Sequence, residues 1–97
     1  MTGERIDQLL PVGSVVLLEG AQKPLLIFGV CQTEKNSGED YDYIGVFYPE
    51  GNIGSETQFL FNQADVDRVV FTGYDSPENQ AFRKKLKAFY AQKNQSE

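Results

Sequence analysis

The chain has 97 residues, 40% of them hydrophobic and 24% charged, which is enough for one packed core and too little for two. Its net charge of -5 is uneven, because residues 1–80 carry 4 Lys/Arg and 13 Asp/Glu whereas residues 81–97 carry 5 and 1. The acidic body would repel phosphate, which argues against nucleic-acid binding. A single cysteine excludes an internal disulfide, and no apolar run approaches the ~18 residues of a membrane span. We expect a cytoplasmic protein.

Five apolar runs, rich in β-branched and aromatic residues and bounded by turn formers, predict five strands. Residues 1–10 precede them as a short lead-in, in which one helical turn is stopped by Pro11. Gly29, inside the second run, predicts a β-bulge or a close approach by another group. Asn62 is expected to cap a short helical turn over residues 63–67. The predicted strands are residues 13–18, 25–31, 41–48, 55–61 and 68–72.

The third of these strands is the most aromatic and ends in the turn formers Pro49–Asn52, which predict a chain reversal. Alternation along residues 41–48 places apolar side chains on both faces of the strand. A strand of this kind belongs in the middle of a sheet rather than at its edge. The polar residues 33–40 that precede it predict a mobile loop.

A helix is expected to begin at Pro77, because Ser76 can cap it and Glu78 stands in its positively polarised first turn. Helical spacing brings four apolar residues onto one stripe, which predicts docking on the sheet. The helix should end near Gln92, and the residues from there to Glu97 should fray. The stripe consists of Phe82, Leu86, Phe89 and Tyr90.

Together these elements predict an α+β fold: a five-stranded, mainly antiparallel, meandering sheet with one long C-terminal helix packed on one face. We expect residues 1–97 to form a single domain. Its ordered core should cover about residues 9–92, between short flexible termini.

The sequence lacks the residues of the common catalytic and metal sites. It contains no histidine, which removes the usual general base and the usual metal ligand. Cys31 lies in an apolar run and is interpreted as a buried structural thiol. We therefore expect no catalytic residue, no cofactor and no resident metal. The one enzymatic alternative is a metal-assisted hydrolase built on the carboxylates of Asp40, Asp42, Asp65 and Asp67.

The tyrosines are more informative, because an aromatic body with a polar tip is enriched in protein interfaces. They can equally be core residues, and the sequence leaves both alternatives open. The turn after the central strand is the better candidate for contact with a partner. A homodimer formed by a sheet face that the helix leaves uncovered is a further alternative. The candidate interaction residues are Tyr41, Tyr43, Tyr48, Pro49, Glu50, Asn52 and Tyr74.

Three segments of the chain together resemble one small family. They read LLPVGSVVLLEGAQKPLLIFG, YDYIGVFYPEGN and FNQADVDRVVFTGYDSPENQAFRKKL. The family is a domain of unknown function encoded beside LXG-type toxins in the type VII secretion loci of Gram-positive bacteria. The similarity covers about residues 9–87.

The resemblance implies a non-enzymatic protein that acts by binding. Its role would be that of an accessory or targeting factor, a chaperone or adaptor, for an LXG toxin or its small helical export partners. The family has no assigned catalytic residues, so none is carried over to this chain. The nearest alternative is an immunity protein that neutralises a toxin domain with its acidic surface.

Overall fold

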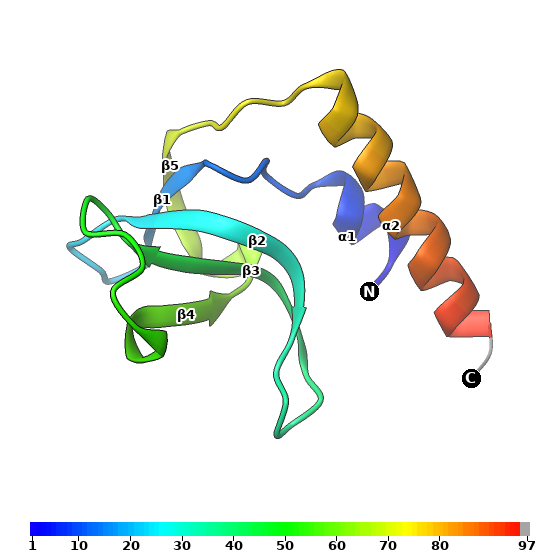
Figure 1. Ribbon diagram of the computed structural model, residues 1–97, viewed down its shortest axis with the longest axis horizontal. Coiled ribbons are helices and arrows are strands. Elements are labelled where there is room, and N and C mark those ends of the chain that lie inside the picture. The colour runs from blue at the N-terminus through cyan, green and yellow to red at the C-terminus, as the bar shows by residue number, and fades with distance from the viewer. Residues whose placement is uncertain (96–97) are drawn as a thin grey trace. The chain divides into compact units, whose positions relative to one another are not determined.

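The computed structural model describes residues 1–95. They form an α+β fold with a five-stranded antiparallel sheet and one long C-terminal helix (Figure 1). The chain divides into two compact units. The sheet unit is Leu10–Tyr74, and the helical unit combines Met1–Leu9 with Asp75–Glu97.

The five predicted strands are all present in the sheet unit, where the spatial order is β4-β3-β2-β1-β5. The first four follow one another as an antiparallel meander, as expected. The fifth returns across the sheet to pair with β1, so β4 and β5 form the two edges. The strands are β1 (Val15–Leu18), β2 (Leu25–Thr33), β3 (Asp40–Phe47), β4 (Gln58–Phe61) and β5 (Val66–Phe71).

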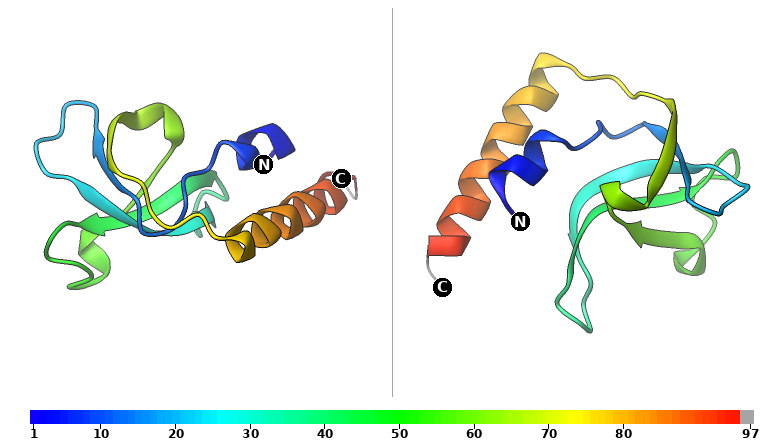
Figure 2. Two further views of the ribbon diagram at one scale, coloured as in Figure 1. Left: turned by 90° about the horizontal axis from the view of Figure 1, so that it is seen from above. Right: turned by 180° about the vertical axis from the view of Figure 1, so that it is seen from behind.

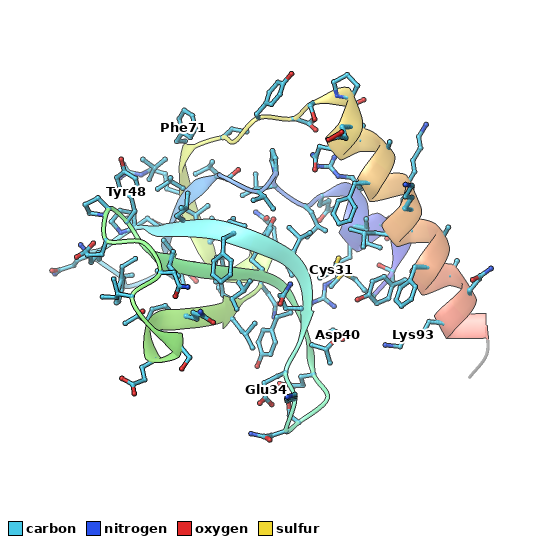
Figure 3. The ribbon with its side chains drawn as sticks, viewed as in Figure 1. Cys31, Glu34, Asp40, Tyr48, Phe71 and Lys93 are labelled. Atoms are coloured by element: carbon cyan, nitrogen blue, oxygen red, sulfur yellow. The ribbon has the colours of Figure 1, made fainter. Side chains whose placement is uncertain are left out.

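The connections differ from the prediction at two places. β2 and β3 each extend by one residue into the predicted loop 33–40, at Thr33 and Asp40, and residues 34–39 form the loop of this hairpin (Figure 3). The Thr33 hydroxyl donates to the Asp40 carboxylate at 2.7 Å and helps to close this hairpin. Residues predicted to begin the fourth strand form instead the 3-10 turn η1 (Ser55–Thr57).

A β-bulge lies where Gly29 predicts one. The register between β2 and β3 shifts between Ile27 and Gly29. A Cβ atom on Gly29 would lie 2.8 Å from the Ile44 side chain, closer than two carbons can approach. A larger residue would need the Ile44 side chain to shift, so the space between the bulge and β3 favours glycine.

The core lies on one face of the sheet. Residues directly opposite each other in an antiparallel pair share a face, and the register places most of the buried side chains of the sheet together on this face. Val46, on the other face of β3, is also buried, which confirms that this strand has two apolar faces. The core-face residues are Val16, Leu25, Ile27, Tyr43 and Phe61.

The link between β4 and β5 contains the predicted helical turn, η2 (Gln63–Asp65). Asn62 and Asp65 form a capping box across it, in which the Asn62 amide donates to the Asp65 carboxylate at 2.8 Å. The Asn62 side-chain oxygen accepts the amide of Asp42 at 2.9 Å. This turn therefore ties the β4–β5 link to the central strand.

The helical unit consists of α1 (Gly3–Asp7) and α2 (Pro77–Gln95), which lie alongside each other (Figure 2). The Ser76 hydroxyl accepts the amide of Asn79 at 3.0 Å, so the predicted N-cap is confirmed. The Arg83 guanidinium donates to the Leu9 carbonyl at 2.9 Å. Lys87 binds the Asp7 carboxylate at 3.0 Å. These bonds fix α1 against one side of α2.

The apolar stripe of α2 divides between two environments. Tyr90 is buried, whereas Phe82 and Phe89 are exposed. Docking of this helix on the sheet stays a prediction. α2 continues past the predicted end at Gln92, and residues 96–97 of the segment expected to fray lie outside the described residues. None of the helices in residues 1–95 is long and apolar enough to cross a membrane.

Candidate protein-binding groove

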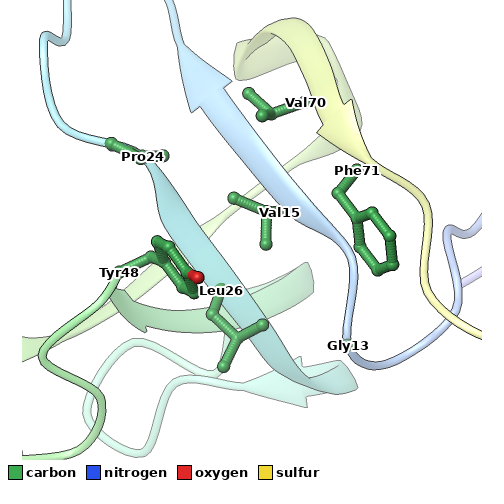
Figure 4. A pocket seen from close by; sticks show the side chains of 7 residues that line it. All are labelled: Gly13, Val15, Pro24, Leu26, Tyr48, Val70 and Phe71. Carbon is green, nitrogen blue, oxygen red and sulfur yellow. The ribbon is translucent and has the colours of Figure 1, made fainter.

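An apolar groove of about 440 Å³ opens on the sheet unit (Figure 4). It lies on the sheet face opposite the core, because Val15, Leu26 and Phe71 face one another across β1, β2 and β5. Among the lining side chains, the Tyr48 hydroxyl is the one polar group. The groove is therefore suited to receiving apolar side chains rather than to performing acid–base chemistry. Its lining residues are Gly13, Val15, Pro24, Leu26, Tyr48, Val70 and Phe71.

The two sides of the groove are the most exposed apolar part of its lining. Tyr48 is 50% exposed on one side, and Val70 and Phe71 are 52% and 61% exposed on the other. Val15, on the floor, is buried. Apolar groups that stand exposed on both sides of a shallow apolar floor are typical of a protein-binding surface.

A bulge in β5 brings two of these side chains to the groove. The register with β1 places Val15 opposite Phe71 but Val16 opposite Val69. Val70 is thus an extra residue in β5, with no residue opposite it in β1. Because alternation is broken at this point, Val70 and Phe71 both reach the groove side (Figure 4).

The turn after β3 forms one rim of the groove and is held by its own polar contacts. Lys23 and Glu50 form an ion pair of 2.9 Å. The hydrogen bond from Lys23, aided by a backbone amide, holds the pKa of Glu50 below its ordinary value. Asn52 accepts from the side-chain amide of Gln58 at 3.0 Å. Glu50 and Asn52 are both exposed, so this predicted contact region is accessible.

The predicted interaction residues do not form one surface. Tyr48, Pro49, Glu50 and Asn52 lie together at the exit of β3. Tyr41 lies at the other end of this strand, seven residues or ~23 Å from Tyr48. Its hydroxyl donates to the Glu39 carboxylate at 3.0 Å.

Tyr43 and Tyr74 behave in opposite ways. Tyr43 is completely buried, so its place among the interaction residues is corrected: it is a core residue. Its hydroxyl accepts the amide of Leu10 at 2.9 Å and donates to the Gln63 side-chain oxygen. Tyr74 is 83% exposed and is not among the residues that line the groove.

Three of the four carboxylates of the hydrolase alternative have structural roles, and the fourth, Asp67, is exposed on β5. Asp42 is buried and accepts the amide of Gln63 at 2.9 Å. The Asp40 carboxylate accepts the hydrogen bond of Thr33 in the hairpin, and the Asp65 carboxylate accepts that of Asn62 in the capping box. Within residues 1–95, no group of three or more Cys, Asp or Glu residues could hold a metal ion. Cys31 is half-buried rather than buried and has a positive φ of 54°.

Sequence reasoning found Tyr48 but missed Val70 and Phe71. Both belong to a predicted strand, for which no contact role was predicted. A signal was nevertheless present, because the charged residues Asp67 and Arg68 give the first half of the strand a polar character. The position of this strand at an edge, which exposes it, depends on pairing with β1.

The comparisons with known proteins identify a family and no function. The family described as "Domain of unknown function (DUF4176)" matches residues 9–82 of the chain. No curated protein and no solved structure matches the chain.

Proposed function

We propose, from the premise that this chain belongs to the family described as Domain of unknown function (DUF4176), that it is a non-enzymatic protein-binding accessory factor. The observation that carries the proposal is the apolar groove with Tyr48 on one side and Val70 and Phe71 on the other. A partner that places apolar side chains in this groove removes three large exposed groups from water. Each square ångström of apolar surface buried in this way is worth roughly 25 cal/mol.

The more specific proposal is that the partner is an LXG toxin of a type VII secretion system, or one of its small helical export partners. It is supported by the resemblance of the three segments quoted above. The factor would act in the cytoplasm as a chaperone or adaptor before export. The sheet unit and its groove would provide the contact.

Co-expression with the LXG toxin and helical partners of one locus, followed by size-exclusion chromatography, tests this function. We expect at least one of them to co-elute with the chain. Elution of the chain apart from every one of them would refute the proposal.

A matched pair of substitutions then locates the contact. Phe71→Ser should weaken co-elution, because it removes an exposed ring from the groove. Ile53→Ser is the control, since Ile53 is 66% exposed and is not among the groove residues. Equal loss in both variants would remove the groove from the interface.

An immunity role is the nearest alternative, and the acidic sheet unit favours it. Residues 10–74 carry three Lys/Arg and nine Asp/Glu, a net charge of -6. An immunity protein protects cells that express the toxin domain alone. A targeting factor requires the N-terminal LXG region. Truncated toxins that carry only one of the two parts therefore separate these roles.

A further inference from the structure

β5 is an edge strand whose second half carries neither a charge nor a proline against pairing. It is bonded to β1 on one side, and the described part of the chain places no strand on its other side. Its charged residues, Asp67 and Arg68, lie in its first half, while Val69, Val70 and Phe71 follow at 39%, 52% and 61% exposure. Natural edge strands are usually short, charged or interrupted by proline.

The other edge of the sheet is different. β4 has four residues, directly follows the turn η1 and is at most half-exposed. Its last residue, Phe61, is buried and packs against Tyr43, with ring centroids 5.3 Å apart. The second half of β5 is therefore the better template for an added strand.

The groove gives an added strand somewhere to place its side chains. A bulge can turn an edge away from pairing, but the bulge at Val70 also directs two apolar side chains to the groove side. Alternate side chains of a strand point to the same face. A strand beside β5 would therefore project every second side chain over Phe71 and toward the groove.

The added strand could come from a second copy of this chain or from another protein, and the charge of the sheet unit favours another protein. Two sheet units of net charge -6 would repel each other. An extended segment rich in Lys or Arg meets the opposite field. The attraction should weaken with salt, since charges are screened over ~10 Å at 0.1 M.

We propose that β5 binds a basic, extended segment of a partner protein as a sixth strand, with apolar side chains of that segment in the adjacent groove. The inference rests on the proposed protein-binding function and names the chemistry of the partner. Backbone hydrogen bonds to β5 give the affinity, and the apolar groove together with the net negative charge of the sheet unit selects the sequence.

A synthetic peptide of roughly eight residues, alternating lysine with valine or phenylalanine, is the probe. We expect it to shift the amide NMR signals of Val69, Val70 and Phe71 and to slow their hydrogen exchange. The same peptide with N-methyl groups along one edge cannot pair and should not bind. Equal binding of the methylated peptide, or of a peptide with glutamate in place of lysine, would overturn the inference.

Two substitutions of equal charge change complete the test. Val70→Lys should weaken binding of the lysine peptide by roughly tenfold or more, because it removes an apolar contact and adds a repelling charge. Ile53→Lys should change it by less than about twofold. Equal effects in both would overturn the inference. If Val70→Lys does not fold, the methylated peptide still decides with the unaltered protein.

The outcomes also separate this inference from the proposed function. Co-elution of a partner together with no binding of the lysine peptide would overturn strand addition and leave the protein-binding function in place. A dimer in light scattering that Val70→Lys dissociates would likewise overturn the inference, since the edge would then be occupied by a second copy.

Discussion

The substitution Tyr43→Phe removes one oxygen atom from the centre of the sheet unit and leaves the ring in place. The Tyr43 hydroxyl joins two distant parts of the chain, since it accepts the Leu10 amide at 2.9 Å and donates to the Gln63 side chain. The aromatic contact with Phe61, at 5.3 Å between centroids, is kept. The variant therefore tests the hydrogen bonds alone.

The cost follows from the two groups that lose their partner. A hydrogen bond contributes about 0.5–1.5 kcal/mol net, and an unsatisfied buried group costs more. Leu10 and Gln63 are half-buried, so water compensates for part of the loss. We expect Tyr43→Phe to lower the free energy of unfolding by about 2 kcal/mol. For a domain of this size, the melting temperature should fall by roughly 8–16 °C.

Thermal unfolding followed by circular dichroism measures this effect. Tyr41→Phe is the matched control: it makes the same chemical change two residues away, where the hydroxyl bonds to Glu39 in an exposed pair. We expect no measurable change in its melting temperature. If the two variants melt together, the buried hydroxyl does not hold the sheet unit, and the reasoning is refuted.

Three further outcomes are expected. Gly73→Ala should destabilise the fold by about 1–3 kcal/mol, because its Cβ atom would lie 2.6 Å from the Val12 carbonyl oxygen; wild-type urea stability would contradict this. Phe47→Ala should cost about 2 kcal/mol rather than the 3–5 of a fully buried ring, since Phe47 is half-buried against Phe59 at 4.9 Å between centroids. A cost above 4 would show deeper burial. A hydrogen bond from the Ser37 side chain, followed by those from the backbone amides of Ser37 and Asn36, lowers the pKa of Glu34 from 4.5. The folded pKa is below the unfolded value, so this contribution is present above pH 4.5 and is lost as the pH falls through the folded pKa. In an NMR titration, Ser37→Ala should raise that midpoint.

Local chemistry in the sequence determined most of the elements. Ser76, Pro77 and Glu78 together form a strong helix start, and α2 begins at Pro77. Gly29 predicted a bulge that the register confirms. These features depend on a capping hydroxyl or a missing Cβ within a few residues of the chain. They can therefore be predicted from the sequence.

The sequence also placed the turn of the candidate site, through Tyr48 and the residues after it. It could not distinguish Tyr43 from Tyr48. Their positions differ by an odd number, which predicts opposite faces of β3. Which face is covered is decided by the other strands, and they bury Tyr43 while Tyr48 stays half-exposed.

The tertiary structure alone decided where β5 lies. A meander predicts that it follows β4, whereas it pairs with β1, more than forty residues earlier in the chain. That pairing creates the bulge at Val70, exposes Phe71 and closes the groove with Leu26 and Tyr48. Long-range pairing is selected by the burial of whole faces, which no local pattern records. The sequence by itself thus determined the strands and the helix, and the tertiary structure decided which of their apolar residues form a surface for a partner.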